Sequence, residues 1–155
     1  MKTKTITTNI EIYDYEELSE NFRKLIDTAK AQTQKAYAPY SKFHVGSAIL
    51  LANGMIIGGS NQENVAYPSG LCAERVSVFY ANAQFPDIPI EAIAVAAYQN
   101  EKFTIQPVCP CSACLQVLIE SETRFGKPIK LILYGQNNVH IINSIKECLP
   151  LYFHF

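Results

Sequence analysis

Three consecutive stretches decide the fold: CAERVSVFYANA at residues 72–83, IEAIAVAAY at residues 90–98 and CSACLQVLIESETR at residues 111–124. The first and the third repeat apolar residues at helical spacing, whereas the second is a continuous apolar run. A run of this kind is typical of a strand that is buried on both faces. The order helix, strand, helix therefore predicts an α/β domain in which helices cover a sheet.

The flanking segments continue this alternation. A helix is expected after Asp14, because Asp14 and Glu17 have the spacing of a capping box and apolar residues at helical spacing follow them. Residues 43–59 predict a hairpin, because the dipeptide Asn53-Gly54 separates two apolar runs. Further elements are expected at residues 129–134 (strand), 139–142 (strand) and 144–148 (short helix).

Domain organisation follows from the same pattern. The β-branched residues 4–13 predict an extra strand or an ordered arm, so that residues 1–13 form an N-terminal arm. Residues 14–155 then form a single domain, since no linker or repeat interrupts them. Three main helices and about five strands predict a three-layer α/β domain.

Composition excludes several classes of protein. The 155 residues carry 13 Lys and Arg against 14 Asp and Glu, so a net charge of -1 offers no field to attract nucleic acid or an anionic membrane. No apolar run reaches the roughly 18 residues of a membrane helix, and the opening MKTKTITTNI lacks the apolar core of a signal peptide. We therefore expect a cytoplasmic protein whose five cysteines are reduced thiols or metal ligands.

Three cysteines have the placement of metal ligands. Cys111 and Cys114 lie three residues apart at the start of one predicted helix, and Cys72 opens another. A helix N-terminus favours thiolates, because its dipole and free N–H groups stabilise negative charge. If the two helix starts meet, three thiolates point at one spot and suit zinc, one ion per chain. Three ligands leave the fourth position open, as in catalytic zinc sites.

Glu74 and Arg75 add the chemistry of a catalytic centre. Glu74 lies two residues after Cys72, where its carboxylate can stand beside the metal and move protons for an activated water. Three thiolates give a zinc site a net negative charge that opposes ionisation of water. Arg75 is the expected source of charge compensation, together with the helix N-termini.

Two simpler readings of these cysteines remain open. A structural zinc site would want a fourth ligand, with Cys109 or a histidine as candidates. A redox pair would use Cys111 and Cys114 and would leave Cys72 and Glu74 without a role.

The motifs together resemble the small homotetrameric cytidine deaminases. A metal ligand, one residue and Glu, followed by Pro-Cys-x-x-Cys, is the pattern of zinc nucleobase deaminases, which include a three-cysteine variant. The resemblance runs from about residue 18 to 153 and rests on AYAPYSKFHVGSAIL (36–50), GGSNQENVAYPSGLCAERVSVF (58–79) and PCSACLQVL (110–118). It implies an α/β/α sandwich around a five-stranded mixed sheet, with the metal between two helix N-termini.

The resemblance also implies roles for residues that bind substrate. Asn61 and Glu63 match a segment that holds the ribose 3′-hydroxyl, and Phe43 matches an aromatic residue that packs on the pyrimidine. The backbone around Cys72 and Ala73 would meet the polar edge of the base.

Two further residues would act across subunits. Tyr67 matches a residue near a neighbouring subunit's site, and Phe153 is aligned with a C-terminal aromatic that closes over a neighbour's substrate. The expected assembly is a homotetramer with shared active sites, which the aromatic tail at residues 152–155 also favours.

The sequence departs from the family where Ser112-Ala113 replaces Gly-Ala and Leu115-Gln116 replaces Arg-Gln. The expected activity is hydrolytic deamination of cytidine and deoxycytidine to uridine and deoxyuridine, a reaction of pyrimidine salvage. The expected partner is a small nucleoside, with no nucleic acid and no membrane. Two alternatives stay open: a deaminase of a modified nucleoside, such as a blasticidin-type enzyme, or a non-enzymatic interaction domain stabilised by zinc.

Overall fold

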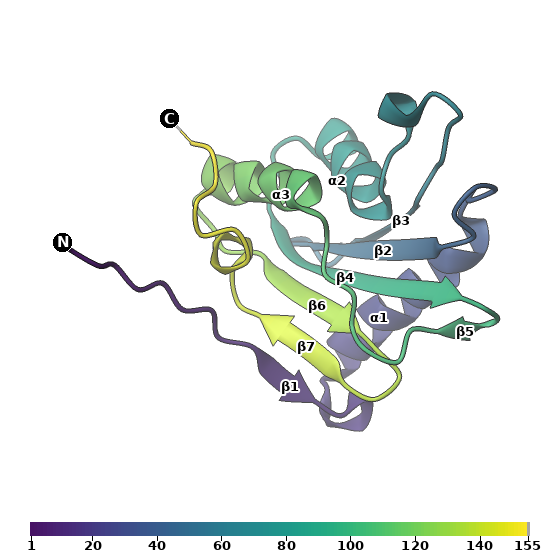
Figure 1. Cartoon of the computed structure of the whole chain (residues 1–155), viewed down its shortest axis with the longest axis horizontal. Helices are drawn as coiled ribbons and strands as arrows, with labels where there is room; N and C mark the ends of the chain where they lie inside the picture. The colour runs from purple at the N-terminus through teal and green to yellow at the C-terminus, as the bar shows by residue number, and fades with distance from the viewer. Residues whose placement is uncertain (155) are drawn as a thin grey trace.

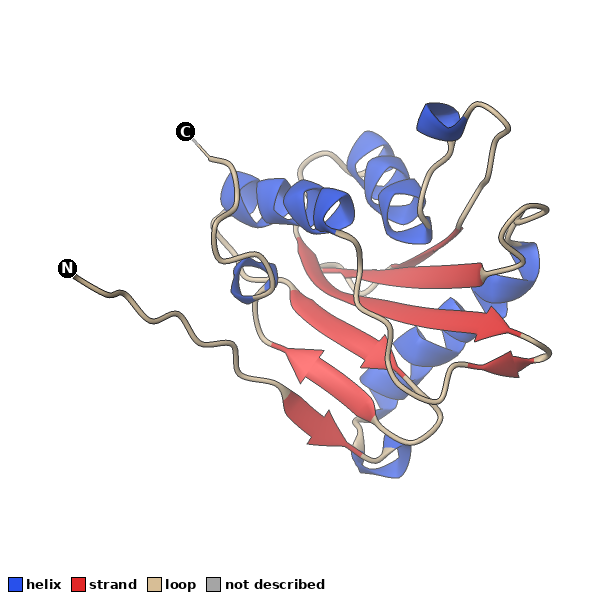
Figure 2. Cartoon of the chain, viewed as in Figure 1, coloured by secondary structure: helices blue, strands red, loops and turns tan. Residues whose placement is uncertain are grey.

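The computed structural model describes residues 1–154 and shows one mixed sheet with helices on both faces (Figures 1 and 2). The strand order is β1-β7-β6-β4-β2-β3, and β5 pairs with β4. Strands β4 and β6 are parallel, while the other pairs are antiparallel. The strands are β1 (Glu11–Tyr13), β2 (His44–Leu51), β3 (Ile56–Ser60), β4 (Ile90–Gln99), β5 (Lys102–Phe103), β6 (Lys130–Tyr134) and β7 (Val139–Ile142).

Three α-helices form the outer layers. Helix α1 (Glu20–Gln32) covers one face of the sheet, and α2 (Ala73–Gln84) and α3 (Ser112–Phe125) lie side by side on the other (Figure 1). Short 3₁₀ turns occur at η1 (Tyr15–Glu17), η2 (Thr33–Lys35), η3 (Tyr67–Ser69) and η4 (Ile145–Glu147). The predicted three-layer architecture is therefore confirmed.

The central strand β4 explains how the two helical layers differ. Its alternate residues point to opposite faces. The small residues Ala92, Ala94 and Ala96 pack with α1, whereas Ile93 and Val95 join the core beneath α2 and α3. Helix α1 thus lies close to the sheet. A Cβ atom on Gly46 of β2 would stand 2.0 Å from the carbonyl oxygen of Ala29, so this position excludes a side chain.

Two predictions about the elements were wrong. The sheet has seven strands rather than five, because β1 extends the β7 edge and the two-residue strand β5 folds back on β4. The first helix begins at Glu20, not at the capping box: Glu17 accepts from the backbone N–H of Asp14, but this contact caps only η1. Leu18 then takes an extended conformation and is buried in the α1 layer, which separates the two turns.

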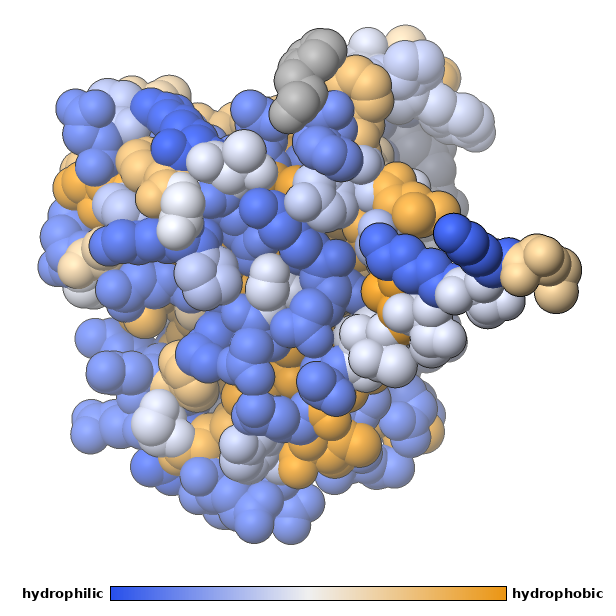
Figure 3. Space-filling model, turned by 90° about the vertical axis from the view of Figure 1, so that its left-hand side faces the viewer, coloured by the Kyte–Doolittle hydropathy of each residue, from blue (hydrophilic) through white to orange (hydrophobic). Residues whose placement is uncertain are grey.

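The strand in the N-terminal segment is shorter than the predicted residues 4–13. Only residues 11–13 pair in the sheet. Residues 1–10 form an extended arm that leads away from the sheet (Figure 1), and the hydroxyl of Thr8 donates to the carbonyl oxygen of Glu147 at 2.6 Å. This segment projects from the body of the protein in Figure 3. None of the helices in residues 1–154 combines the length and hydropathy needed to cross a bilayer. Phe155, part of the aromatic tail, lies outside the described residues.

Candidate metal centre and active site

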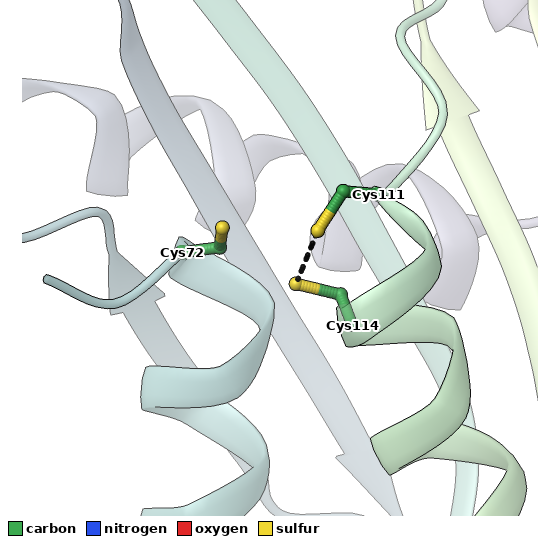
Figure 4. A group of neighbouring side chains, drawn as sticks. All are labelled: Cys72, Cys111 and Cys114. Carbon is green, nitrogen blue, oxygen red and sulfur yellow. Dashed lines mark hydrogen bonds between the residues drawn. The ribbon is translucent and has the colours of Figure 1, made fainter. Parts of the chain in front are cut away.

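Two helix N-termini bring the predicted cysteines together. Cys72 is the N-cap residue of α2, Cys111 is the N-cap residue of α3, and Cys114 lies in the first turn of α3. Their Sγ atoms all lie within 4.8 Å of one another, and Cys111 and Cys114 are 3.5 Å apart (Figure 4). Three thiols that converge on one point are a soft donor set for a metal ion, so the residues present fit zinc.

The position of α2 depends on a polar contact with the sheet. The buried hydroxyl of Ser47, on β2, donates to the carbonyl oxygen of Ala73 at 2.8 Å and lies 2.8 Å from the hydroxyl of Ser77. Ser77 in turn bonds the carbonyl oxygen of Glu74 at 3.0 Å. These contacts hold the first turn of α2 against the strand, and with it the residue that opens the helix.

The cluster favours a thiolate at Cys72. Its hydrogen bond with Cys114, supported by the Arg75 guanidinium, lowers the pKa of Cys72 to about 5. Nη2 of Arg75 lies 3.7 Å from the Sγ of Cys72, so a positive charge lies beside this thiol. The pKa of Cys114 is raised, first by the same hydrogen bond with Cys72. Leu115, where the family usually carries Arg, is buried in the core beneath α2 and α3 and adds no charge.

Glu74 is a buried carboxyl group beside the thiols. Its side chain is 4% exposed in the first turn of α2. Burial raises the pKa of Glu74 to about 7, and the charge at Cys72 acts in the same direction. A carboxyl group with such a pKa can both take and give a proton near neutral pH.

Cys109, the candidate fourth ligand of a structural site, does not belong to this cluster. Its hydrogen bond with the thiol of Cys148 lowers the pKa of Cys109 to about 7. Cys148 packs against the core and its pKa is raised by the same contact. Among residues 1–154, the groups close enough to share an ion are therefore three cysteines only.

An open cavity of about 560 Å³ leads to the cluster. Of the predicted site residues, it is lined by Asn61, Glu63, Tyr67, Cys72 and Arg75. The others lie outside this lining: Phe43, Ala73, Glu74, Cys111 and Cys114.

The two residues predicted to hold the sugar also shape the loop around the cavity. Asn61 accepts from the backbone N–H of Val45 at 2.8 Å and donates to the carbonyl oxygen of Phe43 at 2.9 Å. The carboxylate of Glu63 accepts from the N–H groups of Tyr40 and Ser41 at 2.8 and 3.3 Å, and its pKa is lowered by hydrogen bonding, first of all with Ser41. The cavity wall thus consists of segments that are distant in sequence.

The remaining predicted residues differ in exposure. Phe43 is half-buried in the loop before β2, Ala73 is fully buried at the start of α2, and Tyr67 is 80% exposed on η3. The structure adds Tyr40 and Ser41, which line the cavity and bind Glu63 through their backbone. Both stand inside the motif at residues 36–50, but no spacing rule marks them, because their contact with Glu63 spans more than twenty residues.

The comparisons agree with this geometry. A sequence model of the cytidine and deoxycytidylate deaminase zinc-binding region matches residues 19–126. The chain belongs to this deaminase family. The resemblance to the cytidine deaminases is therefore confirmed, and membership of a family defined by a zinc-binding region supports a metal site at the three cysteines.

Individual relatives of this chain are cytidine deaminases. A cytidine deaminase of Sporosarcina psychrophila is 44% identical over 97 residues, which are 63% of this chain and 67% of that protein. A cytidine deaminase of Halalkalibacterium halodurans is 40% identical over 96 residues, or 62% and 68% of the two chains. The crystal structure of cytidine deaminase from Burkholderia pseudomallei matches with a TM-score of 0.74 at 36% identity, over 88% of this chain and all of the other.

Proposed function

We propose that the protein catalyses hydrolytic deamination of cytidine and deoxycytidine to uridine and deoxyuridine, a step of pyrimidine salvage, in the cytoplasm. The observation that carries this proposal is the buried carboxyl of Glu74 beside three converging cysteine thiols, in a chain of the deaminase family.

The metal would be zinc, one ion per chain, held by Cys72, Cys111 and Cys114. Bound there, zinc supplies Lewis-acid activation of the attacking water. Arg75 and the N-termini of α2 and α3 offset the negative charge of the thiolates.

Glu74 would move the protons of the reaction. It takes a proton from the attacking water and gives it to N3 of the base while oxygen bonds to C4. It then takes the second proton of that water from the new hydroxyl group on C4 and passes it to the amino group. The C4–N4 bond breaks as the C4 carbonyl forms and ammonia leaves, so that cytidine and water yield uridine and ammonia. The raised pKa of Glu74 suits both steps, because the group changes protonation state easily at neutral pH.

Substrate would bind in the cavity beside the cysteines. We propose that Asn61 and Glu63 hold the 3′-hydroxyl, that Phe43 packs on the pyrimidine and that the backbone at Cys72 and Ala73 meets its polar edge. Both nucleosides share the 3′-hydroxyl, so this set accepts both.

We further propose a homotetramer with shared sites, formed by the catalytic domain of residues 14–155, with residues 1–13 as an additional arm. Tyr67 at the cavity rim and Phe153 in the C-terminal tail would reach the neighbouring subunit's site. Their large exposed side chains, together with Phe79 and Tyr80 on α2, support this assembly.

The test is release of ammonia from cytidine, deoxycytidine, cytosine, CMP and adenosine by the zinc-loaded protein and by Glu74→Gln. Rapid turnover of the first two is expected. Glu74→Gln should lower kcat by a factor on the order of 10² to 10⁴ while one zinc per chain remains bound. Glu91→Gln, which changes an exposed carboxylate on β4, is the control and should keep full activity. A protein that binds zinc but turns over neither nucleoside would overturn the proposal.

A further inference from the structure

The side chain of Gln116 on α3 binds the C-terminal tail. The side-chain amide of Gln116 donates from Nε2 to the carbonyl oxygen of Phe153 at 2.9 Å, and its Oε1 accepts from the backbone N–H of Phe153 at 3.0 Å. Both polar groups of the glutamine therefore bind one peptide residue, in the way that neighbouring strands exchange hydrogen bonds. This pair of hydrogen bonds, the Gln116 clamp, fixes the position of Phe153 and also the orientation of its backbone.

The tail around this contact is ordered by a second anchor. Tyr152 packs against the core beneath α2 and α3, and Nζ of Lys146 lies 5.8 Å from the centre of its ring. The next residue, Phe153, is nevertheless 69% exposed. Chain ends usually fray unless something holds them. Here the Gln116 hydrogen bonds and the packing of Tyr152 help to hold a terminal segment that carries an exposed aromatic residue.

Stability of the isolated chain does not explain this arrangement. A phenyl ring gains stability by burial, about 25 cal/mol for each Å² removed from water, and an exposed ring forgoes most of it. Aromatic residues, Phe among them, are enriched at protein–protein interfaces, so a held and exposed Phe153 suits contact with a partner surface. Gln116 also lies two residues after Cys114, so the helix that carries two of the clustered cysteines is the one that holds the tail.

We propose that Gln116 is a positioning residue, which holds Phe153 in the orientation that completes the nucleoside site of a second copy of this chain. The proposal rests on the proposed function and on the assembly described with it. It differs from that function in assigning a role to a side chain of α3 that belongs neither to the cysteine cluster nor to the cavity lining.

The first test separates the effect of the two hydrogen bonds from the effect of the packing of the Gln116 side chain. Gln116→Met keeps the size of the side chain and removes both bonds, while Glu120→Met makes a similar change at an exposed position one turn further along α3. We expect Gln116→Met to raise the KM for cytidine about tenfold, the range of one lost aromatic contact on a base, with kcat within about threefold of the wild type. Glu120→Met should change neither constant.

The second test asks whether Gln116 acts through Phe153. Phe153→Ala should raise KM to a similar extent, and the variant with both changes should be no worse than Phe153→Ala alone, because the clamp then has nothing to position. Additive losses would overturn the proposal, as would a Gln116→Met variant with the KM of the wild type.

Hydrogen exchange at the Phe153 amide judges the clamp without any substrate. The wild type should protect this amide, and Gln116→Met should exchange it at least about tenfold faster. Equal exchange rates would show that the clamp does not hold the tail. A wild type that protects the amide but deaminates no cytidine would instead remove the proposed function, and with it the role at the neighbour's site, while the clamp itself stands.

Discussion

At the scale of single residues, Asn61 combines two tasks that the sequence does not separate. Its side chain lines the cavity and also bridges the carbonyl oxygen of Phe43 and the N–H of Val45. Both partners flank the start of β2, where the chain enters the sheet. A substitution at this position should therefore affect folding as well as binding.

Asn61→Ala should lower the free energy of unfolding by about 1 to 3 kcal/mol, because it leaves two partly buried backbone groups without their partner. It should also raise the KM for cytidine. Urea unfolding followed by circular dichroism measures the first effect, and initial rates of deamination measure the second.

Asn64→Ala is the matched control for stability. Asn64 also lines the cavity, but its side chain accepts only from the N–H of Ala66 in an exposed turn, so the loss should stay below about 0.5 kcal/mol. If both variants lose the same free energy of unfolding, the hydrogen bonds of Asn61 contribute no more to stability than the single turn contact of Asn64.

The sequence predicted contacts between residues that lie close together along the chain. Cys111 and Cys114 are three residues apart on one helix, so their convergence follows from helix geometry. The contacts of Glu63 with Tyr40 and of Gln116 with Phe153 join segments that no periodicity relates, and only the folded chain shows them. The sequence therefore identified the cysteine cluster but not the groups that hold the cavity wall and the tail.

At the scale of elements, the distance between α2 and β3 sets the position of Cys72, the N-cap residue of α2 and a member of the cysteine cluster. A Cβ atom on Gly59 would stand 2.7 Å from the backbone nitrogen of Ser77 and 2.8 Å from the carbonyl oxygen of Ala73. The backbone of α2 thus touches the strand with no space for a methyl group. Any side chain at Gly59 must move the helix that begins at Cys72.

Gly59→Ala should weaken zinc binding by at least about tenfold and lower deaminase activity with it, because disturbing the groups that orient metal ligands commonly costs roughly 10- to 100-fold in affinity. Competition with a chromogenic chelator measures the affinity. The control is Gly58→Ala, whose Cβ atom would meet the end of the flexible side chain of Gln32 and can be accommodated. If both variants bind zinc as the wild type does, the close approach of α2 does not set the site.

The secondary-structure elements show the same limit of prediction from sequence: local patterns are found, whereas elements that depend on tertiary contacts are missed. Residues 43–59 were predicted as a hairpin and form β2 and β3 around Asn53-Gly54, since the turn chemistry is local. Strand β5 has two residues and no periodicity to detect, and β1 pairs only because β7 offers a free edge. The count of five strands failed at these two short elements, which depend on tertiary contacts.

At the scale of the whole molecule, the exposed apolar residues suggest how copies would associate. Phe79 and Tyr80 are adjacent on α2 and are 46% and 57% exposed. Helix α2 also has Cys72, which lines the cavity, as its N-cap residue, so a contact along this helix would bring a second copy close to the cavity. Assembly and activity should therefore respond together when this surface changes.

The variant Phe79→Glu with Tyr80→Glu tests this link. Light scattering should give four chains for the wild type and smaller species for the variant at the same concentration, because burying two carboxylates in an apolar interface costs several kcal/mol. Circular dichroism should show an intact fold, since both side chains are exposed in the single chain. The KM for cytidine should rise as the tail of the neighbour is lost.

Met55→Glu, at an exposed position between β2 and β3, is the control for adding a charge to the surface. A wild type that is monomeric and fully active would contradict shared sites, and a variant that stays tetrameric would place the interface away from the middle of α2.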